Sequence, residues 1–281
     1  MADEPQEGKP KGASFKPDFA TIGGIVLAFG SIVAGLIMEK GNIHDVAQVT
    51  SALIVLGGTF GAVMVTTPLG TVLGAAKKFG SVFFGKQESP QAAIEEIIGY
   101  AAQARRDGIV SLETQAAAIA DPFLNKALSL AVDGVESATI RDIMELEISI
   151  MEEHIEAEAK VFEAAGGYAP TIGIIGAVLG LIQVMKNLAN IDEVGRGIAV
   201  AFVATIYGVA AANLIFLPAA GKLKARGKEA VQVRELMLEG VLAIANGVNQ
   251  KLIRLKLEGY LGHKASAKKG EAAGEAVAQE A

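Results

Sequence analysis

The sequence predicts an all-α integral membrane protein with four transmembrane helices and a helical cytoplasmic domain between the second and the third of them. Two observations lead to this fold class. Four stretches of the 281 residues carry no charged side chain, and each is long enough to cross a bilayer core of about 30 Å as a helix. The polar segment between the second and third stretches has apolar residues at helical spacing, and no part of the chain shows the alternation typical of a strand.

Two charge-free stretches form the first predicted membrane hairpin, residues 18–76. The charged residues that bound them are Asp18, Glu39, Asp45 and Lys77. We expect the second span to run from Ser51 to Leu73, with Pro68 near its end. No small-residue cleavage site follows the first stretch, so it is expected to stay in the chain as a span and not to act as a signal peptide.

The other two stretches form the second predicted hairpin, residues 164–221. Their bounding charges are Glu163, Lys186, Arg196 and Lys222. From Gly166 to Met185, five of twenty residues are glycine, and Pro170 stands near the start. Each internal glycine costs a soluble helix roughly 1 kcal/mol, and an interior proline costs about 3. In a membrane, glycines let helices approach closely, which explains their number without any further role.

Between the hairpins, residues 77–163 are predicted to form an acidic helical cytoplasmic domain. Ser89 and Pro90 are typical of a helix start, and that helix is expected to stop at Gly108. Further helices are expected from near Ser111 to Asp121, from Pro122 to Val132, and from Ser137 directly into the third span. Acidic residues outnumber basic ones by 16 to 8 in this domain, which argues against nucleic acid as a partner.

The remaining segments flank the membrane part. Residues 1–17 and 264–281 are polar and are expected to stay flexible. Residues 222–263 are expected to form a cytoplasmic amphipathic helix, interrupted at Gly240 and Gly247, whose basic face packs against the acidic domain. Lys and Arg gather near the span ends on the side of both termini and of the acidic domain, so these parts are predicted to be cytoplasmic.

The composition excludes several kinds of active site. The chain has no cysteine, which rules out thiol catalysis and iron–sulfur ligation. The three histidines lie far apart, and no acid–base pair, nucleophile constellation or phosphate loop appears, so no metal, cofactor or enzymatic activity is predicted. The four spans hold no ionisable residue. If the chain takes part in ion movement, the titratable group must come from another chain.

Two prolines and two threonines of the second hairpin form the first candidate site. They are Pro170, Thr171, Thr205 and Pro218, on adjacent spans joined by a short loop. A proline inside a helix removes a backbone donor and leaves a carbonyl without its partner. Beside a wet cavity that carbonyl can meet water or an ion, so the group suggests a pathway wall or a hinge. Plain structural kinks, with the threonine hydroxyls bonded to their own backbone, are the alternative.

Longer motifs resemble a known family. The segments "GGYAPTIGIIGAVLGLIQVMKNL" and "GRGIAVAFVATIYGVAAANLIFLPAAGKL" are similar to the third and fourth spans of the flagellar stator A subunits, the MotA/PomA family. The resemblance extends to "ARRDGIVSLE" and "LMLEGVLAIANGVNQKLIR". It implies a bacterial inner-membrane protein that forms a homopentameric ring around a dimer of MotB/PomB-like B subunits, whose membrane aspartate carries the ion. Ion flow would then turn the ring and drive the flagellar rotor switch protein.

The resemblance also implies a rotor-facing site. Arg105 and Glu113 match the family's charged pair that engages the rotor, and Arg106 lies beside them. Two exposed charges that simply flank a turn are the alternative. Gln250 stands where many relatives have a proline, and this departure affects only the local turn.

Within the membrane, the resemblance implies an ion pathway. Pro170 and Pro218 match prolines that couple ion passage to movement, and Thr205 matches a threonine near the B-subunit aspartate. Ala177 stands where sodium-driven relatives have a second threonine. Since a sodium site needs several oxygen ligands, the proton is the expected ion.

Three other functions compete with the proton-driven stator. A sodium-driven stator differs only in the ion. An energiser of outer-membrane processes, resembling ExbB or TolQ, typically has three spans, so the two-plus-two arrangement of four spans favours the stator. A scaffold without conduction explains the glycines and the acidic helices but not the matched prolines beside a threonine in two adjacent spans.

Overall fold

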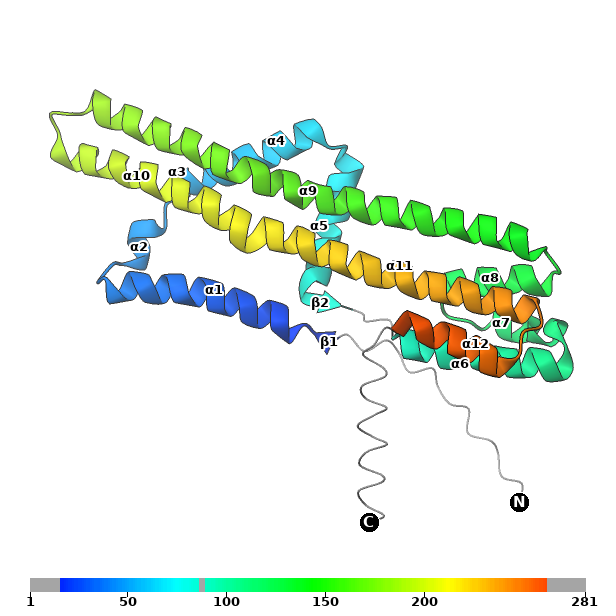
Figure 1. Cartoon of the computed structure of the whole chain (residues 1–281). Coiled ribbons are helices and arrows are strands. Elements are labelled where there is room, and N and C mark those ends of the chain that lie inside the picture. The colour runs from blue at the N-terminus through cyan, green and yellow to red at the C-terminus, as the bar shows by residue number, and fades with distance from the viewer. Residues whose placement is uncertain (1–15, 86–88, 262–281) are drawn as a thin grey trace, which may run out of the picture. The chain divides into compact units, whose positions relative to one another are not determined.

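The computed structural model describes residues 16–85 and 89–261, and the chain divides into two compact units (Figure 1). The membrane unit comprises Met1–Gln87 and Ile155–Ala225, and the polar unit comprises Glu88–His154 and Arg226–Ala281. The flexible arm expected at residues 1–17 lies outside the described residues except for its last two, and the tail expected at 264–281 lies outside them entirely.

The all-α fold class is confirmed, with one small departure. Strand β1 (Lys16–Pro17) pairs antiparallel with β2 (Phe84–Gly85), although no strand was expected. Four helices of the described residues are long and apolar enough to cross a membrane, as predicted. Two of these helices lie within the membrane unit. The other two, Ser137–Lys186 and Ile191–Ala245, lie partly within it.

The first span is α1 (Phe19–Met38), followed by the one-turn helix α2 (Ile43–Val46). Asp18 caps α1, because its carboxylate accepts a hydrogen bond from the Thr21 N–H at 3.1 Å. The same carboxylate pairs with the Lys222 ammonium at 2.5 Å. No residue of α1 is buried, so the unit's core is formed without it.

The second span is shorter than expected. It consists of α3 (Val49–Ala52), a π-helical turn η1 (Leu53–Gly57) and α4 (Gly58–Thr66). The prediction that it continues to Leu73 is wrong: Thr67 adopts an extended conformation, as residues before a proline do, and the chain turns before α5 (Leu69–Phe83) (Figure 1).

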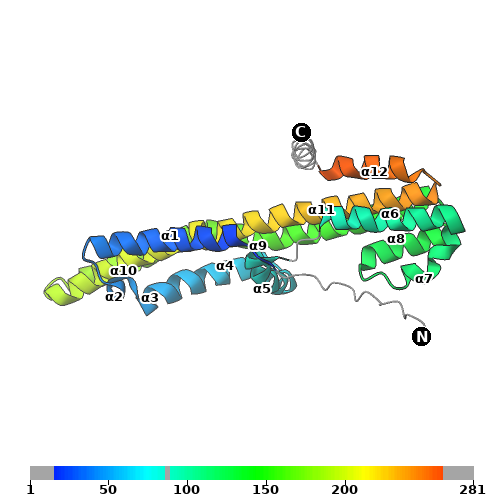
Figure 2. The ribbon, with the colours of Figure 1, turned by 90° about the horizontal axis from the view of Figure 1, so that it is seen from below.

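The third and fourth spans form a long antiparallel pair. Helix α9 (Ser137–Lys186) runs directly into the third span, as predicted, and passes through Pro170 without a break. Helix α10 (Ile191–Ala210) leads through a second π-helical turn, η3 (Ala211–Phe216), into α11 (Leu217–Ala245). Figures 1 and 2 show α9 and α10 side by side. Small side chains of α9, η3 and α11, together with Phe162, Phe216 and residues of α4 and α5, form the membrane unit's core.

The polar unit is built from short helices around the ends of α9 and α11. Its elements are α6 (Pro90–Asp107), a 3-10 turn η2 (Ile109–Leu112), α7 (Glu113–Ala116), α8 (Pro122–Val132), α12 (Gln250–Glu258) and η4 (Gly259–Leu261). Ser89 caps α6 as predicted, accepting from the Ala92 N–H at 3.4 Å. The helix expected from Ser111 to Asp121 shrinks to η2 and α7, because the N–H groups of Ala118 and Ile119 bond three residues back in tight turns.

The basic residues of α11 and α12 pack on the acidic helices, as predicted. The Arg234 guanidinium lies 2.5 Å from the Asp121 carboxylate, and Arg254 lies 2.5 Å from Glu95. Gly240 does not interrupt α11, contrary to expectation. A β-carbon there would stand 2.7 Å from the Ile97 side chain, so the glycine permits close packing inside a continuous helix. Gly247, with φ of 64°, lies beyond the end of that helix.

Candidate functional site

Helices α9 and α10 touch backbone to backbone within the membrane unit. A β-carbon on Gly173 would lie 2.9 Å from the Ala204 carbonyl oxygen, and one on Gly180 would lie 2.7 Å from the Gly197 carbonyl oxygen. The same β-carbon on Gly173 would be 3.5 Å from the Cα of Thr205. The candidate residues of α9 are therefore held on a helix that contacts the backbone bearing Thr205.

The two threonine hydroxyls of the candidate site both bond within their own helix. Thr205 donates to the Ala201 carbonyl at 3.2 Å, and Thr171 donates to the Tyr168 carbonyl at 2.8 Å. Each hydroxyl oxygen keeps lone pairs that can accept a further hydrogen bond or meet a cation. Thr171 is exposed and Thr205 is half-buried, so the two differ in what can reach them.

The two prolines stand in different surroundings. Pro170 lies inside α9, where it deprives the Gly166 carbonyl of its usual donor four residues on. The side chain of Leu217 covers Gly166, within 2.7 Å of the place where a β-carbon would stand. Pro218 is the second residue after η3, so a proline and a π-helical turn weaken the same part of the fourth span.

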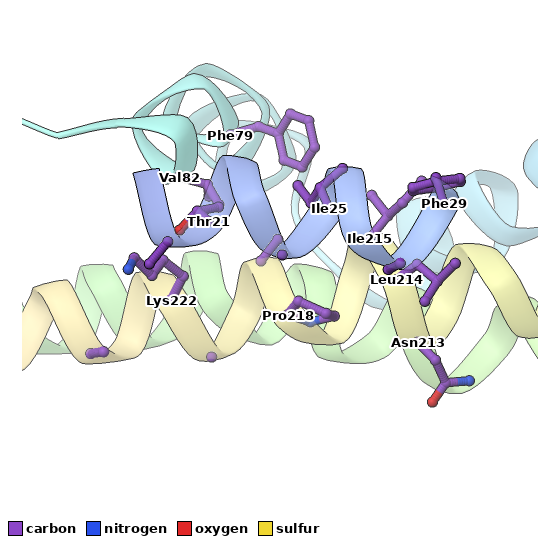
Figure 3. Close-up of a pocket in the computed structure, with 16 residues that line it drawn as sticks. Thr21, Ile25, Phe29, Phe79, Val82, Asn213, Leu214, Ile215, Pro218 and Lys222 are labelled. Carbon is purple, nitrogen blue, oxygen red and sulfur yellow. The ribbon is translucent and has the colours of Figure 1, made fainter. Parts of the chain in front are cut away.

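A cavity of about 550 Å³ separates α1 from the fourth span (Figure 3). The α1 side of its lining extends from Ala20 to Phe29, and α5 contributes Phe79 and Val82. Pro218 and Lys222 line it from the side of α11. The wall is apolar over most of its length, and the ion pair of Lys222 with Asp18 stands at one end.

A smaller groove, of about 390 Å³, adjoins this cavity and contains Thr205. Ile32 of α1 faces Thr205, Ile206 and Val209 across it. Asn213 and Leu214 line both hollows. The structure thus connects Thr205 with Pro218 along one side of the fourth span. Among the candidates on α9, none of Pro170, Thr171 and Ala177 lines either hollow.

Asn213 is a site residue that the sequence reasoning did not select. Its side chain is exposed on the apolar fourth span, and its amide donates to the Val209 carbonyl at 2.9 Å. An amide at membrane depth needs a polar neighbour or water to satisfy its remaining groups. Its spacing of eight residues from Thr205, two helical turns, was the signal that could have found it.

Tyr207 joins the fourth span to the connection between the first two spans. Its hydroxyl donates to the Val46 carbonyl at 2.6 Å and accepts from the Gln48 N–H at 3.2 Å. The buried Ser51 hydroxyl lies 3.3 Å from the Val200 carbonyl of α10, two helical turns before Tyr207. Residues 46–51 are therefore bonded to one face of α10.

The candidate rotor site lies on the turn after α6. Gly108, with φ of 86°, reverses the chain between Arg105 at the end of α6 and Glu113 at the start of α7. Both side chains are exposed. The Gln103 amide cross-links the two sides of the turn: it donates to the Ser111 carbonyl at 3.0 Å and accepts from the Gln115 amide. Arg105 and Glu113 are therefore exposed on either side of one turn.

Arg106 differs from Arg105 in its electrostatic surroundings. Its guanidinium pairs with the adjacent Asp107 at 2.9 Å. The hydrogen bond from Arg106 lowers the pKa of Asp107 and raises the pKa of Arg106 itself. The Arg106 charge is offset locally, which makes Arg105 the stronger candidate for engaging a partner's charge.

Two carboxylates of low exposure, Asp121 and Glu239, hold the polar unit together through ion pairs. Burial raises the pKa of Asp121, but the Arg234 guanidinium and two backbone N–H groups outweigh it, and the pKa lies below its ordinary value. Glu239 pairs with Arg141 at 2.7 Å and with Lys256, and its pKa is lowered in the same way against the effect of burial. Arg234 also stacks over the Phe123 ring at 5.2 Å.

Comparisons with known proteins relate most of the chain to motility proteins. The sequence model of the MotA/TolQ/ExbB proton channel family matches residues 115–236, and that of the motility protein A N-terminal region matches residues 22–105. Motility protein A of Bacillus subtilis (strain 168) is 38% identical over 248 residues, covering 87% of this chain and 91% of that protein.

Two solved structures have the same fold. The structure of C. jejuni MotAB matches with a TM-score of 0.84 and 36% identity, covering 88% of this chain and 97% of that one. The flagellar MotAB stator complex from Bacillus subtilis matches with a TM-score of 0.81 and 37% identity, covering 89% and 98%.

Proposed function

The chain belongs to the motility protein A family, and from this premise we propose that ion flow through a complex of this chain with a B subunit drives rotation of the flagellar motor. The chain is the A subunit of a flagellar motor stator and a multi-pass membrane protein. Its fold matches that of the MotAB stator structures, which favours the stator over an outer-membrane energiser.

The B subunit is proposed to supply the ion-carrying group. The four stretches predicted as spans contain no Asp, Glu, Lys or Arg. A carboxylate in hydrocarbon costs several kcal/mol unless a pathway requires it, and such a group marks the pathway in ion-moving proteins. This absence is the observation that most directly supports a pathway in which a second chain supplies the ion-carrying group.

The groove beside α10 is the proposed part of the pathway contributed by this chain. Thr205 and Asn213 are the two polar residues of its otherwise apolar lining, and Val209 lies between them. Pro218 lines the adjoining cavity beyond the η3 turn. A π-helical turn followed by a proline is a place where a helix can bend at low cost, which suits a step that links ion passage to movement.

Protons are proposed as the transported ion. Ala177 offers no oxygen, while Thr171 and Thr205 each offer one hydroxyl that is already engaged with its own helix. Sodium prefers a site with several oxygen ligands at close range, whereas a proton needs only a titratable group and a hydrogen-bonded path. No resident cofactor and no enzymatic conversion is proposed.

Arg105 and Glu113 are proposed to engage the rotor, and several copies of this chain are proposed to form a homopentameric ring around a B-subunit dimer. We place the chain in the bacterial inner membrane with both termini and the polar unit in the cytoplasm. The exposed pair of opposite charges beside the Gly108 turn supports the rotor contact. The basic residues at one end of the spans support the cytoplasmic placement.

Swimming speed in a stator-deleted host that expresses this chain with its B partner tests the proposal. Speed is measured across a sodium titration at constant ionic strength and with a protonophore. We expect speed to ignore sodium and to collapse with the protonophore. Sodium-dependent speed would overturn the ion assignment, and absence of motility from a well-assembled complex would overturn the motor role.

A further inference from the structure

Helix α10 is fixed on two of its faces. One face meets α9 through Gly197, Ala201, Ala204 and Gly208, whose backbones lie against the glycines of α9. A second face, marked by Val200 and Tyr207, is bonded to residues 46–51. Thr205 lies beside these faces and borders the groove toward Ile32.

The Tyr207 hydroxyl makes two of the hydrogen bonds on the second face. It accepts from the N–H of Gln48, which precedes α3, and donates to the carbonyl of Val46, the last residue of α2. Irregular backbone near a membrane must find such partners, because lipid offers none. Ser51 adds a weaker bond to Val200 on the same face at 3.3 Å.

The close contact with α9 sets the separation of the two helices, because glycine and alanine let their backbones approach closely. A directional hydrogen bond on a neighbouring face adds a restraint on how α10 is turned about its axis, because donor and acceptor must stay near 3 Å and roughly in line. Rolling of α10 would move Thr205 and Asn213 relative to the groove.

We propose that Tyr207 is a positioning residue: its hydroxyl locks the rotation of α10 against Val46 and Gln48 and thereby holds Thr205 in the groove. The functional part of this inference rests on the proposed pathway role of Thr205. The geometric part stands without it.

Tyr207→Phe tests the lock, because it removes one oxygen atom and keeps the ring. Tyr168→Phe on α9 is the matched control, since the Tyr168 hydroxyl has no hydrogen-bond partner among the described residues. The chain has no cysteine, so spin labels attach only to introduced ones. Labels at the exposed positions Ala47 and Phe202 report the distance between the connection and α10 in the assembled complex, with labelled chains diluted into unlabelled ones.

We expect Tyr207→Phe to broaden or shift the distance distribution between positions 47 and 202, and Tyr168→Phe to leave it unchanged. In unlabelled complexes, Tyr207→Phe is expected to lower swimming speed while the amount of assembled complex stays normal. Should Tyr207→Phe fail to assemble, Ser51→Ala is expected to change the distribution in the same direction by a smaller amount.

An unchanged distribution in the assembled Tyr207→Phe variant, or in Ser51→Ala if that variant replaces it, would overturn the lock. A changed distribution with full swimming speed would overturn its role in positioning the pathway. Failure of the proposed function has a different signature: Thr205→Val would then swim normally, whatever the labels at positions 47 and 202 report.

Discussion

The carbonyl oxygen of Ala169 lies 2.5 Å from the point where a β-carbon on Gly208 would stand. The third and fourth spans therefore meet at a place with no room for a side chain. Gly173 and Gly180 make similar contacts along the same pair of helices, with backbone atoms of α10 as their neighbours. Backbone atoms cannot move aside as a flexible side chain can, so these glycines set the distance between the two helices.

Gly208→Ala is expected to push the third and fourth spans apart and to lower stability by about 1 to 3 kcal/mol, the usual cost of overpacking. Thermal unfolding of the detergent-solubilised complex measures this effect. Gly195→Ala is the control on the same helix, because a β-carbon there meets no atom within 4 Å. Equal melting temperatures for the two variants would contradict the close contact.

Thr59→Val is expected to stabilise the membrane unit. Thr59 is fully buried, and its hydroxyl has no hydrogen-bond partner among the described residues. An unpaired buried hydroxyl costs about 1 to 3 kcal/mol, and valine has nearly the same shape without it. Thr66→Val serves as the control, since the Thr66 hydroxyl is bonded to the Val63 carbonyl at 3.1 Å. A lower melting temperature for Thr59→Val would indicate that the hydroxyl has a partner such as water.

Thr205→Val is expected to abolish or strongly reduce swimming while leaving the complex assembled. The substitution keeps the branched shape and removes the hydroxyl, which donates to the Ala201 carbonyl at 3.2 Å. Thr205→Ser keeps that hydroxyl and should retain most of the speed. Swimming assays combined with co-purification of the B subunit separate loss of function from loss of assembly. A Thr205→Val strain that swims at normal speed would remove Thr205 from the pathway.

Arg105→Glu is expected to impair swimming more than Arg106→Glu. The Arg106 charge is already paired with Asp107 at 2.9 Å, whereas Arg105 is exposed at the end of α6. Surface pairs of this kind are worth less than about 1 kcal/mol, so neither change should unfold the polar unit. Torque at high load is the measurement, and a compensating charge reversal on the rotor should partly restore the Arg105→Glu strain. The reverse order of effects would favour Arg106 as the contact.

Asp121→Asn is expected to lower the melting temperature of the protein at pH 7 and to have less effect at pH 3. The pKa of Asp121 is below its ordinary value of 3.8 in the folded chain, so its stabilising contribution is complete above that value. The contribution is lost as the pH falls through the lowered pKa, because the protonated carboxyl no longer pairs with Arg234. At neutral pH we expect a loss of about 1 to 3 kcal/mol.

Melting curves by circular dichroism at the two pH values measure the Asp121 effect. Asp142→Asn is a suitable control, because Asp142 is exposed on α9. A difference between wild type and Asp121→Asn that is the same at pH 3 and pH 7 would mean that the ion pair does not titrate in this range.

Much of the fold was predictable because its signals are local. Ser89, Pro90 and Gly108 mark the two ends of α6 within a few residues, and the run of small and apolar residues around Pro170 marks the third span. The second span was predicted too long, because its length of apolar sequence outweighed the effect of Pro68 on the residue before it. The π-helical turns at Leu53–Gly57 and Ala211–Phe216 have no comparable signal, since packing decides where a helix accepts an extra residue.

The candidate site was predicted only in part. Thr205 and Pro218 do line hollows beside α1, and Arg105 and Glu113 are exposed on either side of one turn. Asn213 was visible in the sequence as a polar residue at membrane depth, but its place between the two hollows depends on how the fourth span is turned toward α1.

The sequence by itself determined the number of spans, the absence of a titratable group within them and the helical character of the polar unit, because charge-free runs, caps and helical periodicity act over a few neighbouring residues. Only the tertiary structure decided that Tyr207 bonds to Val46 and Gln48, about 160 residues away in sequence, and that Thr205 borders a groove. Such contacts depend on the rotation and spacing of whole helices, which are set by glycine contacts and single hydrogen bonds between distant segments.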